Sequence, residues 1–313
     1  MTFAALGPVA PSAAAALAER LWCTIPKGPV RPFSTPGERF EVLIDGRAVV
    51  VESWGEGPIV YLLHGWGGWR GQFDGFVRPL LDAGFRVVAL DAPSHGDSAP
   101  GAFGKGRGLL PELSVALTRV VDAVGPAYAV VGHSLGGSAA AIAVLDGLRA
   151  EHLVLVAAAA DPVPYTHDFA ATFGFGEAVR TGFLRRLEHR VKRRMSDYDI
   201  PARARAAVSA LPKALVVHDT GDKEVRYADA GAVVAAWPGA EQWSTEGLGH
   251  RRILRAPEVV AGIVSRLAAE LATGQPRLAA QRPRPVADET ADRPGSRPTA
   301  AEPENLQLVA NHG

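Results

Sequence analysis

The stretch that decides the fold is Tyr128-Ala129-Val130-Val131-Gly132-His133-Ser134-Leu135-Gly136-Gly137. Its first four residues predict a buried strand, and the small residues from Gly136 onward predict a helix. The G-x-S-x-G pattern between them is typical of a turn that has no room for Cβ atoms beside the serine. Such a turn lifts the hydroxyl of Ser134 out of the sheet and aims a helix N-terminus toward it. We expect Ser134 to be a nucleophile, and a plain strand–turn–helix junction is the alternative.

Apolar runs on both sides of this stretch predict the remaining strands of a sheet. Asp45-Gly46 is a strong hairpin signal between two strands predicted at Phe40–Ile44 and Ala48–Ser53. Buried strands are predicted at Ile59–Leu63, Phe85–Leu90, Tyr128–Val131, Leu153–Ala157 and Leu215–His218. Helices are predicted at Glu112–Val124, Gly136–Leu148, Ala228–Trp237 and Pro257–Ala272. A hairpin followed by strand–helix repeats predicts an α/β fold with a mostly parallel central sheet flanked by helices.

Three segments depart from this alternation and define the expected domain organisation. Residues 1–37 are predicted to form an N-terminal helix and a proline-punctuated arm, and residues 38–273 the α/β domain. Inside that domain, residues 161–212 contain no predicted strand, so we expect a small helical cap of the kind that commonly covers a binding site. Residues 274–313 are rich in proline and charged residues and lack an apolar period, which predicts a disordered tail.

The overall composition argues against several classes of protein. The 313-residue chain has 33 basic and 33 acidic side chains, a balance that gives no indication of a nucleic-acid partner. Its one cysteine, Cys23, cannot form an intramolecular disulfide, and its alanine-rich N-terminus lacks the basic residues of a signal peptide. We therefore expect a cytoplasmic protein. No apolar run is long enough to predict a membrane span.

A nucleophilic serine in such a turn needs a histidine as base and an acid to orient it. These partners follow the serine in the order acid, then histidine. Of the nine histidines, only His250 lies after the last predicted strand and before the last predicted helix, between glycine-rich residues that let a loop swing over Ser134. The acid follows the strand that ends at His218, where both Asp219 and Asp222 are candidates. We favour Asp222, because Asp219 is closer to the strand end and better suited to shape the turn.

A glycine-rich loop, Leu62-Leu63-His64-Gly65-Trp66-Gly67-Gly68, ends the first buried strand. An oxyanion hole needs a backbone N–H from such a loop, paired with the N–H of the residue after the nucleophile. The predicted donors are therefore the main chains of Trp66 and Leu135. We expect His64 to brace the loop rather than to transfer protons. A phosphate-binding loop is the poorer interpretation, because no lysine and Ser/Thr follow the glycines.

Together these segments resemble the α/β-hydrolase superfamily, specifically its serine-nucleophile, esterase- and lipase-like branch, over residues 38–272. The motifs that carry the resemblance occur in the family's order: His64-Gly65, Asp91–Ser98, Gly132–Gly136, His218–Asp222 and Gly249-His250. The resemblance implies a Ser134–Asp222–His250 triad and an acyl-enzyme, with no metal and no organic cofactor. It also implies a structural role for His95 and Asp97, which lie in a loop that is normally structural in the family.

The expected function is hydrolysis of a carboxylic ester or thioester in a small-molecule acyl substrate. Two alternatives stay open: hydrolysis of an amide, peptide or carbon–carbon bond by the same triad, and a ligand-binding protein without catalytic activity. Trp66, Trp69 and Arg251 flank the predicted site and are candidate substrate-binding residues.

The predicted cap contains two groups of side chains that bear on the substrate. The basic group is Arg180, Arg185, Arg186, Arg190, Lys192, Arg193 and Arg194. It could attract an anionic substrate, such as a carboxylated ester or an acyl thioester of a phosphorylated carrier, or it could be a solvated face balanced by acids. The aromatic group is Phe169, Phe173, Phe175 and Phe183. It could line an acyl pocket, although we favour a role in docking the cap on the sheet.

Overall fold

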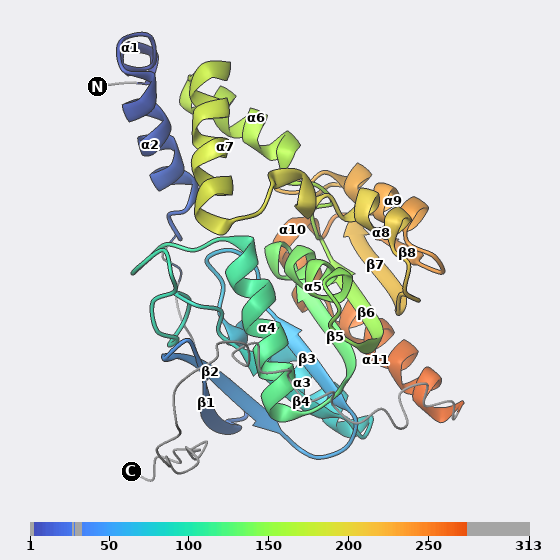
Figure 1. Ribbon diagram of the computed structural model, residues 1–313. Coiled ribbons are helices and arrows are strands. Elements are labelled where there is room, and N and C mark those ends of the chain that lie inside the picture. The colour runs from blue at the N-terminus through green and yellow to red at the C-terminus, as the bar shows by residue number, and fades with distance from the viewer. Residues whose placement is uncertain (1–2, 27, 29–32, 274–313) are drawn as a thin grey trace, which may run out of the picture.

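The computed structural model describes residues 3–26, 28 and 33–273 (Figure 1). The predicted tail at 274–313 and part of the predicted N-terminal arm lie outside these residues. Within the described part, no helix is both long and apolar enough to cross a membrane.

An eight-stranded sheet lies at the centre of the described residues. Its strands are β1 (Glu38–Ile44), β2 (Arg47–Trp54), β3 (Ile59–Leu63), β4 (Arg86–Leu90), β5 (Ala127–His133), β6 (Ala150–Val156), β7 (Lys213–Asp219) and β8 (Glu241–Thr245). Their order in space is β1-β2-β4-β3-β5-β6-β7-β8, and only β2 runs against the others. The predicted mostly parallel sheet is confirmed.

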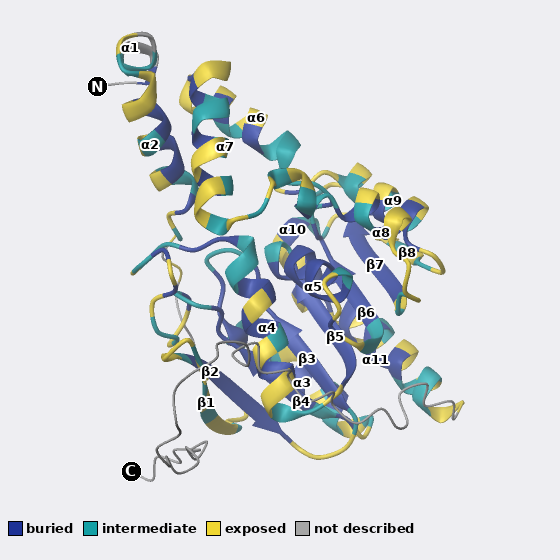
Figure 2. Cartoon of the chain, in the orientation of Figure 1, coloured by how far each residue is buried: buried dark blue, intermediate teal, exposed yellow. Residues whose placement is uncertain are grey.

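Helices cover both faces of the sheet, as predicted. One apolar core includes residues of α4 (Leu110–Val124), α5 (Leu135–Leu145), α8 (Ile200–Ala206) and α9 (Tyr227–Ala236). The core on the other face includes residues of α3 (Asp74–Asp82) and α11 (Pro257–Ala272). The spacing of apolar residues that predicts helix α4 also explains its packing. Leu113, Leu117 and Val120 recur on one face of the helix and are fully buried. Figure 2 shows the buried residues concentrated in the central strands and in α5.

Strand β8 and helix α3 were not predicted. Strand β8 lies at the edge of the sheet, and its five residues, Glu-Gln-Trp-Ser-Thr, are exposed or half-buried, so they lack the apolar run of a central strand. Helix α3 contains Pro79, which is unfavourable inside a helix. It forms nevertheless because Phe76, Val77 and Leu80 are buried against the sheet.

The segment 161–212 contains helices and no described strand. Its elements are α6 (Val163–Phe173), α7 (Glu177–Val191), the 3-10 turn η2 (Met195–Tyr198) and α8. The N-terminal segment contains α1 (Phe3–Val9) and α2 (Pro11–Trp22), and α2 lies beside α7 (Figure 1).

The aromatic side chains of the cap pack differently from the expectation that they dock it on the sheet. Phe169 and Phe183 both contact the ring of Trp22 in α2, with their ring centroids 5.1 and 5.8 Å from that of Trp22, respectively. Phe175 and Phe173 contact Phe3 of α1. All of these rings except that of the exposed Phe173 belong to a separate apolar cluster that joins α6 and α7 to the N-terminal helices.

Candidate active site

Ser134 occupies the turn between β5 and α5 in a strained backbone conformation. Its φ of 54° and ψ of −126° place a non-glycine residue in a region that L-amino acids rarely adopt. Neighbouring chain leaves no space beside it, because a Cβ on Gly136 would lie 2.3 Å from the carbonyl oxygens of Leu63 and His64. The turn therefore requires glycine at 136, as the sequence pattern predicts.

The three residues of the predicted triad come from distant parts of the chain and lie in contact with one another. His250 Nε2 lies 2.9 Å from Ser134 Oγ, and His250 Nδ1 lies 2.8 Å from Asp222 Oδ2. Ser134 follows β5, Asp222 follows β7, and His250 follows β8. They converge because the carboxyl ends of parallel strands lie along one edge of a sheet. His250 is the second residue of a turn of helix, α10 (Gly249–Arg252), rather than part of an open loop, and it is buried.

The carboxylate of Asp222 is held by four hydrogen-bond partners. Its Oδ1 accepts hydrogen bonds from the main-chain N–H groups of Glu224 and Val225, at 2.8 and 2.9 Å. Its Oδ2 lies near His250 Nδ1 and 3.2 Å from Nε2 of the buried His218. Burial raises the pKa of Asp222, but the hydrogen bonds from His218, His250 and the main chain outweigh it and hold the pKa well below the usual range. Asp222 is thus an ionised partner for His250 at neutral pH.

The second candidate acid, Asp219, is fully buried and has a different set of partners. Its Oδ1 accepts a hydrogen bond from Gly221 N at 3.0 Å, which shapes the turn as the sequence indicates. Its Oδ2 accepts hydrogen bonds from Thr245 Oγ1 and Leu248 N, both at 2.9 Å. Asp219 therefore fastens the chain that leads to His250, whereas Asp222 contacts the imidazole itself.

The glycine-rich loop after β3 passes directly beside the serine. A Cβ on Gly65 would lie 2.8 Å from Ser134 Cβ, so only glycine allows this approach. His64 lies 2.8 Å through Nδ1 from the Gly65 carbonyl and accepts a hydrogen bond from Ala92 N through Nε2 at 3.0 Å. Because Nε2 accepts, Nδ1 carries the proton and donates to Gly65. His64 thus braces the loop that positions Trp66, while Leu135 is the first residue of α5.

Sequence reasoning did not identify His133 and His218 as neighbours of the triad. The ring of His133 packs on that of His250, with centroids 4.9 Å apart, and its Nε2 lies 2.8 Å from the His250 carbonyl oxygen. His133 occupies the first x position of the G-x-S-x-G pattern, directly before the serine, and His218 is the last but one residue of β7. Their only signal in the sequence is their position at the ends of the two strands that carry Ser134 and Asp222.

Three buried histidines make the stability of the fold depend on pH. Burial lowers the pKa of His64 to about 4, of His95 to about 4 and of His133 to about 3. Between the unfolded value of 6.5 and these folded values, the unfolded chain binds protons that the folded protein does not. The free energy of unfolding is therefore expected to fall as the pH decreases from 6.5 toward 4, by up to about 1.4 kcal/mol per pH unit for each histidine.

Urea unfolding at several pH values between 7.5 and 4.5 measures this dependence. The variant His95→Gln removes one of the three groups, and its stability should fall less steeply with decreasing pH than that of the wild type. An unchanged slope in this variant would contradict the assignment of His95 as a histidine that stays neutral in the folded state.

A cavity of about 460 Å³ opens onto Ser134 and His250. Trp66 lines it, as proposed for a substrate-binding residue, and so does Phe169. The structure does not bring the other two candidates to it. Trp69 is buried outside the lining, and Arg251 extends into solvent, where its Nε lies 2.9 Å from Glu224 Oε1.

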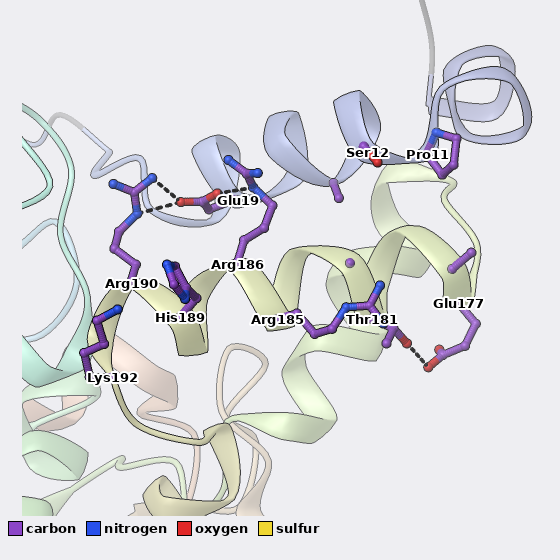
Figure 3. A pocket seen from close by; sticks show the side chains of 13 residues that line it. Pro11, Ser12, Glu19, Glu177, Thr181, Arg185, Arg186, His189, Arg190 and Lys192 are labelled. Atoms are coloured by element: carbon purple, nitrogen blue, oxygen red, sulfur yellow. Dashed lines mark hydrogen bonds and ion pairs between the residues drawn. The ribbon is translucent and has the colours of Figure 1, made fainter.

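The basic group of the cap lies mostly away from this cavity. Several of its members line a groove between α2 and α7 (Figure 3). There Arg186 and Arg190 both reach the buried Glu19 of α2, with Nε–carboxylate distances of 2.5 and 2.8 Å. Arg180 pairs with Glu177, and Arg193 pairs with Asp146. The pairing favours the interpretation of a face balanced by acids over that of a rim that attracts anions.

The loop that holds His95 and Asp97 is part of a buried polar network. The carboxylate of Asp91 accepts hydrogen bonds from Asp97 N and from the main chain of Arg70, at 2.8 and 2.7 Å. The guanidinium of Arg70 also pairs with Asp91 and Glu52. Among the described residues, no group of three or more His, Cys, Asp or Glu side chains is arranged to hold a metal ion.

This chain is similar to known proteins over part of its length. Residues 60–263 match the model of a family described as the alpha/beta hydrolase family. A pimeloyl-[acyl-carrier protein] methyl ester esterase of Nitrosospira multiformis is 38% identical over 112 residues, which cover 34% of this chain and 41% of that protein. A dihydrolipoyllysine-residue acetyltransferase component of the acetoin cleaving system of Cupriavidus necator is 36% identical over 142 residues, 45% of this chain and 33% of that protein. The matches therefore span less than half the length of these relatives.

Solved structures share the fold at low sequence identity. An N-acyl homoserine lactone degrading enzyme superposes with a TM-score of 0.56 at 19% identity, over 72% of this chain and 99% of its own. An esterase from Exiguobacterium antarcticum gives a TM-score of 0.55 at 18% identity, over 74% and 99%. At such identities the likeness shows the fold alone.

Proposed function

Because this chain belongs to the α/β-hydrolase family, we propose that it hydrolyses carboxylic esters or thioesters through an acyl-enzyme on Ser134. One observation carries the proposal: Ser134, His250 and Asp222 form a continuous hydrogen-bonded line at a cavity large enough for a small-molecule substrate. The esterase of Nitrosospira multiformis, which is similar over part of its length, is consistent with an ester as the substrate.

In the proposed reaction, Ser134 Oγ attacks the carbonyl carbon of the ester while His250 Nε2 accepts the hydroxyl proton. The main-chain N–H groups of Trp66 and Leu135 are the proposed donors to the oxyanion, and the N-terminus of α5 adds a favourable dipole. The protonated His250 then gives its proton to the leaving alcohol or thiol. His250 Nε2 then takes a proton from a water molecule, which attacks the acyl carbon, and returns that proton to Ser134 Oγ as the acyl–serine bond breaks and the acid leaves.

Asp222 has two roles in this mechanism. Its hydrogen bond to His250 Nδ1 selects the tautomer in which Nε2 can accept a proton from Ser134. Its carboxylate also stabilises the imidazolium that forms during each step. The low pKa of Asp222 suits this role, because the residue keeps its negative charge while His250 becomes positive.

Comparison of a matched ester and amide tests the reaction class. We expect the wild type to hydrolyse 4-nitrophenyl butyrate over many turnovers and to cleave the 4-nitroanilide of butyric acid far more slowly. Release of nitrophenol and nitroaniline is followed by absorbance. Faster cleavage of the anilide would replace the proposal by an amide hydrolase, and no turnover of either compound would favour a ligand-binding role.

A further inference from the structure

The N-terminal helix α2 forms part of the wall of the cavity at Ser134. Leu21 and Trp22 at the end of α2, and Thr24 just beyond it, line the cavity together with residues of the cap. All three precede residue 60, where the match to the family model begins. The cavity is thus completed by a segment outside the part of the chain that is common to the family.

Several contacts hold this wall in a fixed place. The helices α2 and α7 approach closely at Ala15, where a Cβ on Gly182 would lie 2.9 Å from the Ala15 Cβ. Glu19 of α2 is buried and pairs with two arginines of α7. Beyond the helix, Cys23 O accepts a hydrogen bond from Gly108 N at 3.0 Å, beside Leu109, which also lines the cavity. Figure 3 shows the ion pairs that join the two helices.

The lining of the cavity is mainly apolar and offers no unpaired cation among the residues described for it. Arg193 is the one lysine or arginine among the described lining residues, and its guanidinium binds Asp146 at 2.7 and 3.1 Å and lies over the ring of Tyr198. Two carboxylates, Glu188 and Glu224, also line the cavity. The carboxylate of Glu224 pairs with the exposed Arg251 on its solvent side and reaches to 4.0 Å from His250 Nε2, so it lies beside the reacting centre.

This lining disfavours a negatively charged acyl group. An anion placed in the cavity would lose its hydration and meet carboxylates instead of a free cation. An uncharged apolar group would instead contact Leu21, Trp22 and Phe169. Resting on the proposed function, we infer that the site is selective for uncharged esters with a medium-length apolar acyl group, and that α2 supplies the wall that recognises this group.

The first test compares 4-nitrophenyl acetate, hexanoate and the half-ester of adipic acid, which has the length of hexanoate and a terminal carboxylate. We expect kcat/KM to be at least about tenfold higher for hexanoate than for acetate, because each buried methylene can contribute up to about fourfold. For the adipate half-ester it should be about a hundredfold lower than for hexanoate. Equal values for acetate and hexanoate, or an adipate half-ester as good as hexanoate, would overturn the inference.

The second test changes the wall itself. Trp22→Ala should lower kcat/KM for hexanoate about tenfold and for acetate less than about twofold, since only the longer chain reaches the ring. Leu17→Ala removes an exposed side chain of the same helix and should leave both values unchanged. Trp22→Phe retains an aromatic ring against Phe169 and should lie between the wild type and Trp22→Ala. An equal loss for both esters in Trp22→Ala would mean that the residue only supports the fold, and would contradict its role in selectivity.

The third test changes the charge beside the reacting centre. Glu224→Gln should raise the ratio of adipate to hexanoate hydrolysis severalfold, and an unchanged ratio would contradict the role of this carboxylate.

All of these comparisons are made on activity that Ser134→Ala abolishes. If Ser134→Ala retained the activity, the proposed function would fail; if activity depended on Ser134 but ignored chain length and charge, only the present inference would fail.

Discussion

Replacement of Ser134 by alanine is expected to lower kcat for 4-nitrophenyl butyrate by about 10⁴- to 10⁶-fold. Loss of a nucleophilic serine leaves only the residual catalysis that comes from binding and from the oxyanion hole. The alanine side chain fits the turn, because the strained backbone at this position already carries a Cβ. The variant should therefore fold and bind ester while hydrolysing it only at the residual rate that binding and the oxyanion hole provide.

Ser138 provides a matched comparison for this variant. It lies one turn further along α5, lines the same cavity and donates a hydrogen bond to Ala159 O at 2.8 Å, rather than lying against His250. We expect Ser138→Ala to lower kcat by less than about tenfold, through the loss of one hydrogen bond. Comparable losses in the two variants would show that the cavity, and not the nucleophile, had been damaged.

The second large effect is expected from Asp222→Asn, which should lower kcat by about 10⁴-fold. An amide in place of the carboxylate cannot stabilise the imidazolium, and its NH₂ group favours the tautomer of His250 that has no free acceptor for the Ser134 proton. Since the Asp222 carboxylate accepts hydrogen bonds from main-chain N–H groups, the variant should also be less stable. Kinetics and thermal unfolding of the same sample separate the two effects.

Asp219→Asn is the matched variant of the neighbouring acid. Unlike Asp222→Asn, it should lower the stability of the fold more than it lowers kcat. The amide cannot accept all three hydrogen bonds that come from Gly221, Thr245 and Leu248. We expect a loss of about 1–3 kcal/mol in the free energy of unfolding. The decrease in kcat should stay within about tenfold, because the contact between His250 and Asp222 is retained. A folded Asp219→Asn variant that lost as much activity as Asp222→Asn would show that the assignment of the acid is wrong.

The local parts of the site could be predicted from the sequence because short stretches specify them. A buried strand, a glycine-bounded serine and a small-residue helix are adjacent in the chain. A second buried strand precedes Asp222, and His250 follows two glycines shortly before the last helix. Parallel strands then bring these ends together whatever the packing around them. The confirmed α/β fold follows from the same alternation of strands and helices.

The parts that could not be predicted depend on contacts between distant segments. Nothing near Trp22 indicates that α2 lies against α7 and reaches the cavity, because this placement depends on Glu19 and on the close approach at Gly182. Proximity in the sequence also misplaced Trp69 and Arg251, since a side chain beside a catalytic loop can point to the core or to solvent. Strand β8 escaped detection because an edge strand needs no continuous apolar run.

Trapping the acyl-enzyme tests the proposed mechanism most directly. Wild-type protein is mixed with 4-nitrophenyl butyrate, stopped with acid while turnover continues, digested and analysed by mass spectrometry. The proposed mechanism predicts a butyryl group on the peptide that contains Ser134, at a level that falls once the substrate is exhausted, and none in Ser134→Ala. Continued release of nitrophenol from a protein that carries no acyl group, or carries it on another residue, would contradict it.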